Sequence, residues 1–319
     1  MLSDSFTMRI VFLQKSTDAQ GGSKASLRNT LRALSTIPNL EVELFGEAPG
    51  ALSEFAESIG VPFQVALFPR WRNLVDRIRF QGKMKQIARS LGRADWIVSN
   101  EMWWAPHAVA LAKYCGARSA AIVRDEIADV KKAHQYRFSQ LDQVIAVSED
   151  LRAQFKDASS LYGRTQTIYN IVERPVANDE TRATLKGLCL DCPKVKRWVL
   201  SAGTICARKD QVLLVQALAE MVRHHDEGTG ILFVGGNDSR GYEARVRQAV
   251  VDCGVEDRVV FTGQIAGIGS ALEFAVAKVL TSHSEGLPRV LIESALAGVP
   301  SISTKVSGVD EVYGVHAER

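Results

Sequence analysis

The chain has 319 residues, of which 46% are hydrophobic and 24% are charged, a composition typical of a soluble globular protein. This length predicts two domains rather than one. The formal net charge of +3, from 39 basic and 36 acidic residues, is too balanced to indicate a nucleic-acid-binding protein. We therefore expect no nucleic acid among the partners.

Cysteine usage and hydropathy argue against further classes. The five cysteines are odd in number and scattered, unlike the disulfide framework of a small secreted protein. Cys189 and Cys192 have CxxC spacing, but a zinc ion needs four ligands and no second pair or histidine cluster accompanies them, so we expect no metal. The apolar run Ile10–Leu13 is too short for a signal peptide, and no stretch is long enough to span a bilayer, which predicts a cytoplasmic protein.

Short apolar runs alternate with helical patterns through the first half of the chain. Runs such as Val144–Val147 are apolar at every position, as expected for strands buried on both faces of a parallel sheet. The elements predicted there are, in chain order, strand Arg9–Leu13, helix Ser23–Leu34, strand Val42–Phe45, helix Arg72–Leu91, strand Trp96–Val98, helix Pro106–Tyr114, strands Ser119–Val123 and Gln143–Val147, and helix Glu149–Lys156.

The second half repeats the alternation, which is the signature of a doubly wound α/β fold. Its predicted elements are strand Arg197–Ser201, helix Asp210–Val222, strand Ile231–Val234, helix Tyr242–Cys253, strands Val259–Phe261 and Lys278–Leu280, helix Arg289–Ala297 and strand Pro300–Ser303. Between Ile171 and Lys196 the pattern gives way to polar residues with Pro175 and Pro193.

We therefore predict an N-terminal domain over residues 1–172, a linker over 173–196 and a C-terminal domain over 197–319. Both domains are expected to be Rossmann-like. Because α/β sheets bind ligands at the carboxyl ends of their strands, the expected site is a cleft between the two domains.

The densest signal for chemistry lies in Ser282–Pro300. Gly286, Leu287 and Pro288 form a turn that leads into a helix, whose first N–H groups and dipole suit a phosphate or a sugar hydroxyl. Glu285 precedes this helix and Glu293 lies inside it, and a carboxylate is an acceptor suited to a vicinal diol. Glu293 could instead be a solvated helix residue, but its apolar neighbours indicate that it has a partner.

A second signal is Val199–Asp210, where a buried strand ends at Gly203 and Arg208 and Lys209 precede the next helix. Cations are unfavourable at a helix N-terminus, so the pair indicates an anionic ligand, most simply a diphosphate. An ordinary basic loop is the alternative. A weaker signal is the pair Gly21 and Gly22 after the first strand, where backbone can approach a ligand closely.

Together these residues resemble the retaining GT-B glycosyltransferases of family 4, over nearly the whole chain. The most specific feature is the pair Glu285 and Glu293. Seven residues lie between the two glutamates, and Gly-Leu-Pro follows the first of them. The supporting segments are Gly21–Gly22, Val144–Leu151, Ile168–Asn170, Gly203–Lys209, Leu232–Gly236 and Arg258–Gly263.

The resemblance implies roles for individual residues. Glu293 would hold the ribose hydroxyls of the nucleotide, and Glu285 would contact the donor sugar near the reacting centre. Lys209, helped by Arg208, would neutralise the leaving diphosphate. The remaining residues implied for the nucleotide-sugar site are Gly286, Leu287, Pro288, Arg289, Val290, Gln264 and Ile265, and those implied for the acceptor are Gly21 and Gly22.

Three departures from the family pattern stand out. Thr204 occupies the place where the family usually has an arginine, which Arg208 would have to replace. A histidine is common where this chain reads Val123–Arg124–Asp125–Glu126, so that Arg124 or Asp125 would take its catalytic place. The family would also continue beyond residue 319 with another strand and helices, so we expect a truncated second domain that exposes apolar surface.

The stretch Arg70–Arg93 carries eight basic residues and one acid, with apolar residues at helical spacing (Trp71, Leu74, Val75, Ile78, Ile87 and Leu91). Such a helix can lie on an anionic membrane surface, here the inner face, but we favour a helix that packs its apolar stripe on the sheet. Trp103 and Trp104 are candidates for stacking on a sugar, and packing within the first domain is the alternative.

The expected function is transfer of a hexose, with retention, from a nucleoside-diphosphate sugar to a saccharide or lipid-linked acceptor, with no separate cofactor. The catalytic residues would be Glu285, Asp125 and Lys209. The alternative is a truncated, non-catalytic nucleotide-binding remnant of such an enzyme. A nucleotide-cofactor oxidoreductase is disfavoured, because no strand is followed by GxGxxG and Val234–Asp238 reads VGGND.

Overall fold

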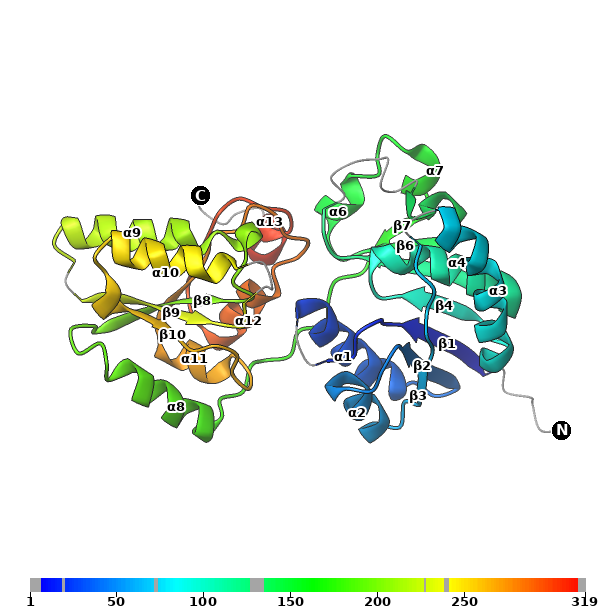
Figure 1. Cartoon of the computed structure of the whole chain (residues 1–319), viewed down its shortest axis with the longest axis horizontal. Helices are drawn as coiled ribbons and strands as arrows, with labels where there is room; N and C mark the ends of the chain where they lie inside the picture. Colours follow the sequence, from blue (N-terminus) through cyan, green and yellow to red (C-terminus); the bar gives the residue numbers. More distant parts are fainter. Residues whose placement is uncertain are drawn as a thin grey trace. The chain divides into compact units, whose positions relative to one another are not determined.

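The structure is a computed structural model of the whole chain (Figure 1). It describes residues 7–18, 21–71, 74–126, 135–226, 228–237 and 241–314, without the side chains of Leu74, Val75 and Arg77. The start of the predicted helix Arg72–Leu91, and Asp238, lie outside the described residues. The chain forms two compact units, Met1–Ile171 and Val172–Arg319.

The first unit is a seven-stranded parallel sheet in the order β3-β2-β1-β4-β5-β6-β7. Its strands are β1 (Met8–Leu13), β2 (Leu40–Gly46), β3 (Phe63–Val65), β4 (Trp96–Ser99), β5 (Arg118–Val123), β6 (Gln143–Ala146) and β7 (Thr165–Thr167). Its principal helices are α1 (Gly22–Ser35), α2 (Ala51–Ser58), α3 (Leu74–Leu91), α4 (Ala105–Cys115), α6 (Glu149–Ala153) and α7 (Ser159–Tyr162). The strands and helices predicted for this half are present, and α2, β3, α7 and β7 are additional short elements.

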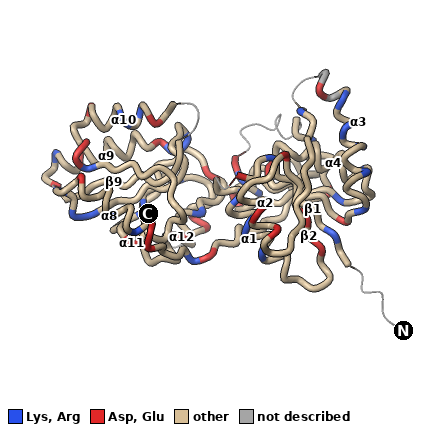
Figure 2. Tube along the Cα trace, turned by 60° about the horizontal axis from the view of Figure 1, so that its bottom comes forward, with Lys and Arg blue, Asp and Glu red and all other residues tan. Residues whose placement is uncertain are grey.

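The basic helix α3 packs into the core of the first unit. Phe80 and Met84 are fully buried beside α4, which agrees with the packing that we favoured from the sequence. Figure 2 shows lysines and arginines along the same helix. Ile78, predicted to lie on the apolar stripe, is instead 73% exposed, because the buried face is the one that carries Phe80, Met84 and Leu91. Contact of this helix with a membrane surface stays a prediction.

The second unit is a five-stranded parallel sheet in the order β10-β9-β8-β11-β12, with an apolar cluster on each face. Its strands are β8 (Arg197–Ala202), β9 (Thr229–Val234), β10 (Val259–Phe261), β11 (Ala275–Leu280) and β12 (Ser301–Ser303). Its helices are α8 (Asp179–Cys189), α9 (Gln211–Arg223), α10 (Tyr242–Asp252), α11 (Gly269–Phe274), α12 (Arg289–Ala297) and α13 (Val309–Tyr313). In Figure 1, α9 and α10 cover one face of the sheet, and α8, α11 and α12 lie on the other.

Helix α8 lies within residues 173–196, which we predicted to be a linker. Asn178 caps it by accepting a hydrogen bond from the backbone N–H of Thr181 at 2.9 Å. Leu185 is fully buried and belongs to the core of the second unit. Much of the predicted linker is therefore part of this unit. The prediction missed the helix because the polar residues of this segment, together with Pro175 and Pro193, are typical of a linker.

Both sheets reverse their strand order at the first strand, between β1 and β4 and between β8 and β11. In open parallel sheets the loops that follow these two strands form the ligand-binding crevice. The backbone is tightly packed there in the second unit, because a Cβ on Gly235 would lie 2.3 Å from the carbonyl oxygen of Gly203. Gly235 also has a φ of +139°, so only glycine fits this position.

Candidate functional site

In the second unit, a buried carboxylate joins the loops that follow β8 and β11. Glu285 is 7% exposed. Its Oε1 accepts hydrogen bonds from Lys209 Nζ at 2.5 Å and from Ser282 Oγ at 2.6 Å, and its Oε2 accepts one from Arg208 Nη1 at 3.2 Å. Two cations and a hydroxyl group therefore hold one carboxylate at the sheet's switch point.

Backbone contacts bind the same two loops together. The Thr281 hydroxyl donates to the carbonyl of Lys209 at 2.8 Å, and the N–H of His283 donates to the carbonyl of Arg208 at 2.8 Å. Arg208 Nη1 also donates to the carbonyl of Ser284 at 2.7 Å. The two cations thus sit on a turn that is fixed to the Glu285 loop, which preorganises the cluster.

Electrostatics keep Glu285 ionised at neutral pH. Burial alone would raise the pKa of its carboxyl, but the charges of Lys209 and Arg208, with the hydrogen bonds from Lys209 and Ser282, outweigh burial and lower the pKa. Because the two cations carry more charge than the single carboxylate, the cluster keeps a positive excess that suits an anionic ligand.

The Gly-Leu-Pro turn leads into α12 as predicted from the sequence, with Leu287 and Val290 buried beneath it. Glu293, one turn into the helix, accepts a hydrogen bond from Arg289 Nη2 at 3.2 Å, so it has the partner that its apolar surroundings indicated. Burial raises the pKa of Glu293, and the positive charges of Arg289 and Lys278 oppose the rise only in part. Glu293 is therefore easier to protonate than Glu285.

The other residues predicted for this site are spread along the same edge of the sheet. Gln264 and Ile265 follow β10, two strands from β8; Gln264 is exposed and Ile265 packs partly against the core. Thr204 is exposed after β8, and Arg208 reaches Glu285 from the other end of that loop. Two residues of the cluster were missed by the sequence analysis, Ser282 and Lys278. A charged residue inside the apolar strand β11 was the available signal for Lys278.

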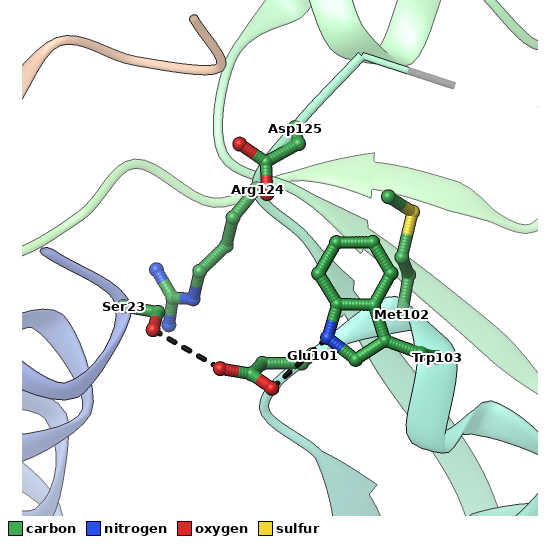
Figure 3. A pocket seen from close by; sticks show the side chains of 6 residues that line it. All are labelled: Ser23, Glu101, Met102, Trp103, Arg124 and Asp125. Atoms are coloured by element: carbon green, nitrogen blue, oxygen red, sulfur yellow. Dashed lines mark hydrogen bonds between the residues drawn. The ribbon is translucent and has the colours of Figure 1, made fainter. Parts of the chain in front are cut away.

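In the first unit, a pocket of about 40 Å³ is lined by Ser23, Glu101, Met102, Trp103, Arg124 and Asp125 (Figure 3). Ser23 follows Gly22 at the start of α1, and Glu101 follows β4, so the pocket lies at the switch point of this sheet. The Glu101 carboxylate accepts hydrogen bonds from Ser23 Oγ at 3.2 Å and from Trp103 Nε1 at 3.0 Å. Trp103 keeps 42% of its surface exposed.

Side-chain amide groups form hydrogen bonds to Arg124, one of the residues that line this pocket. Asn100 is 0% exposed; its Nδ2 donates to Gln14 Oε1 at 2.6 Å, and its Oδ1 accepts from Arg124 Nη2 at 2.8 Å. Arg124 Nη1 also donates to Asn170 Oδ1. A connected network of this kind holds the Arg124 guanidinium in one orientation.

Trp103 and Trp104 differ in exposure, and Gly21 and Gly22 are both exposed. Trp104 is 9% exposed and packs against His107, whereas Trp103 lines the pocket, so only Trp103 is placed to stack on a sugar. Gly21, with a φ of +103°, precedes α1, and a Cβ at Gly21 or Gly22 would meet no atom within 4 Å. Space is therefore open beside both glycines. Sequence reasoning missed Glu101, although its position directly after a strand was a signal.

Among the described residues, no group of His, Cys, Asp or Glu side chains is arranged to hold a metal ion, and Cys189 and Cys192 are free thiols. Within the same ranges, no helix is both long enough and apolar enough to cross a membrane.

Comparisons with known proteins relate this chain to glycosyltransferases. Residues 196–318 match the protein family described as Glycosyl transferases group 1. The chain is 28% identical over 180 residues to an N-acetyl-alpha-D-glucosaminyl L-malate synthase of Bacillus anthracis, covering 56% of this chain and 45% of that protein. It is 33% identical over 122 residues to a GDP-mannose-dependent alpha-(1-6)-phosphatidylinositol monomannoside mannosyltransferase of Mycobacterium tuberculosis, covering 35% of this chain and 31% of that protein. The chain thus spans less than half the length of either relative.

Among solved structures, the crystal structure of Anabaena Alr3699/HepE in complex with UDP and glucose matches with a TM-score of 0.75 at 20% identity. The match covers 95% of this chain and 82% of that chain, so it includes both units. Residues 196–318 are therefore similar to the Glycosyl transferases group 1 family, in a chain whose two Rossmann-like units have the GT-B fold.

Proposed function

We propose that the chain is a glycosyltransferase that moves a hexose from a nucleoside-diphosphate sugar to a saccharide or lipid-linked acceptor, with retention of anomeric configuration. The Glu285 cluster carries the proposal, because it holds Lys209 and Arg208 against the loop that leads into α12, at a switch point. A cytoplasmic location goes with it, since nucleotide sugars are available there.

Each part of the cluster has a task in this proposal. Lys209 and Arg208 would stabilise the charge that develops on the leaving diphosphate, and the first N–H groups of α12 would bind the same anion. Glu285, ionised and held on both oxygens, would face the donor sugar. Glu293 would accept hydrogen bonds from the ribose hydroxyls. Catalysis would then rest on positioning and on stabilisation of the leaving group.

Replacing Glu293 with alanine is expected to weaken nucleoside-diphosphate binding by about 10- to 100-fold, because hydrogen bonds to a charged acceptor contribute about 1.5–3 kcal/mol each. Calorimetric titration of the wild type and Glu293→Ala with UDP, GDP and ADP measures the loss. The same experiment identifies the base of the donor.

Glu220→Ala is a matched control, since Glu220 also pairs with an arginine on its own helix but is exposed on α9. This control is expected to bind as the wild type does. Equal affinity in Glu293→Ala and the wild type would refute the assignment. Binding of a nucleotide with no turnover of any sugar nucleotide would instead favour a non-catalytic nucleotide-binding protein. The anomeric proton coupling of the product, measured by NMR, tests retention.

We further propose that the pocket in the first unit contacts the acceptor, with Asp125 and Arg124 beside the reacting hydroxyl. An exposed aromatic face next to a carboxylate and a guanidinium is suited to a sugar ring with its hydroxyls.

Trp103→Ala is expected to remove saturation-transfer NMR signals from a panel of mono- and disaccharides and to leave UDP, GDP and ADP affinities unchanged. Trp103→Phe, which keeps a ring face, should retain part of the signal. Unchanged saccharide signals in Trp103→Ala would rule out this pocket.

A further inference from the structure

Lys278 is a lysine in the middle of the otherwise apolar strand β11, and it is 0% exposed. Its neighbours in register are Leu200 in β8 and Ser301 in β12, and neither carries a charge. Its ammonium group donates a hydrogen bond to the carbonyl of Val279. Over the residues that the structure describes, no carboxylate lies within ion-pair distance of this ammonium.

Three charged groups act on Lys278, and all belong to the cluster proposed to bind the donor: Lys209, Glu285 and Glu293. Burial and the positive charge of Lys209 lower the pKa of Lys278 to about 7, against the two carboxylates, which raise it. Near neutral pH the side chain is therefore divided between a charged and a neutral form.

Packing does not explain a lysine at this position. The surrounding cluster is apolar, and a methionine of similar length would fill it without the free-energy cost of burying an amine. The charge of Lys278 interacts instead with the charges of Lys209, Glu285 and Glu293. With Lys278 protonated, the site holds four cationic side chains, Arg208, Lys209, Lys278 and Arg289, against two carboxylates.

A nucleotide sugar carries about one negative charge on each of its two phosphates, and protonation of Lys278 adds a positive charge that attracts this dianion. A diphosphate beside Lys209 would screen the repulsion between Lys209 and Lys278 and would attract both ammonium groups. Binding of the dianion therefore favours the charged form of Lys278, and by linkage the charged form favours binding.

We propose that Lys278 is a positioning residue that takes up one proton from solvent when a nucleotide sugar binds beside Lys209. The protonated side chain then supplies a buried positive charge next to Glu285 and Glu293. This inference rests on the proposed function, since it requires that a diphosphate binds at the Glu285 cluster.

The test is calorimetric titration with UDP-glucose, GDP-mannose and ADP-glucose at pH 8 in two buffers with different ionisation enthalpies. The difference in binding enthalpy between the buffers reports the protons taken up. We expect close to one proton per ligand and a loss of affinity of about tenfold between pH 7.5 and 8.5. The measurement is made at pH 8 because an unperturbed imidazole is already neutral there before a ligand binds. Lys278→Met should abolish both effects, and Lys194→Met, an exposed lysine, should preserve them.

Binding without proton uptake by the wild type would overturn the inference and leave the proposed function standing. Proton uptake that persists in Lys278→Met would also overturn it. Absence of uptake by the wild type overturns the inference even if Lys278→Met does not fold. Failure of all three nucleotide sugars to bind would refute the proposed function, and the inference with it.

Discussion

Replacing Lys209 with methionine is expected to lower the turnover number for the nucleotide sugar by about 10²–10³-fold. Lys209 donates a hydrogen bond to Glu285 at 2.5 Å and is proposed to stabilise the leaving diphosphate. Its charge therefore stabilises both the folded protein and the transition state of the reaction. The same change should lower the stability of the second unit by about 2 kcal/mol, because Glu285 would keep only Arg208 as a cationic partner. Turnover is measured as release of nucleoside diphosphate.

Lys194→Met is the control for this variant, since Lys194 forms an exposed ion pair with Asp257 and such pairs contribute little. Lys209→Arg keeps the positive charge and should retain part of the activity. A Lys209→Met protein that turns over the donor within threefold of the wild type would contradict the role of this cation in catalysis.

The first unit is expected to lose about 3 kcal/mol of stability as the pH falls from 6.5 to 4, because of His107. His107 is 3% exposed, its ring centroid lies 4.1 Å from that of Trp104, and its Nε2 lies 2.7 Å from the carbonyl oxygen of Pro69. Its Nδ1 is buried with no hydrogen-bond partner among the described residues. Burial lowers the pKa to about 4, and the hydrogen bond to Pro69 opposes this only in part.

The direction of this pH dependence follows from proton binding at His107 in the folded and the unfolded chain. Between pH 6.5 and 4 the unfolded chain binds a proton at His107 that the folded chain does not, so folding becomes less favourable as the pH falls through this range. Urea unfolding followed by tryptophan fluorescence measures the effect, since four of the five tryptophans, Trp71, Trp96, Trp103 and Trp104, lie in the first unit. In His107→Gln the extra pH dependence should vanish. Parallel stability curves for the two proteins would show that His107 is not buried in its neutral form.

Local patterns in the sequence predicted most of the regular structure. Uninterrupted apolar runs such as Val144–Val147 predicted strands buried on both faces, and proline before Arg289 predicted where α12 begins. The elements that were missed are short, such as β3 and β7, or lie in a polar segment between prolines, such as α8. The Glu285 and Glu293 spacing was visible because both residues belong to one turn and helix.

The sequence by itself determined the alternation of strands and helices, and hence the fold class, because each element depends on residues a few positions apart. Only the tertiary structure decided which distant residues meet. Lys209 and Glu285 are 76 positions apart, and they come together because β8 and β11 are neighbours in the sheet. Ser23 and Glu101 meet for the same reason after β1 and β4. The charge and exposure of Lys278 and His107 likewise depend on what the fold packs around them, since burial and neighbouring charges set a pKa.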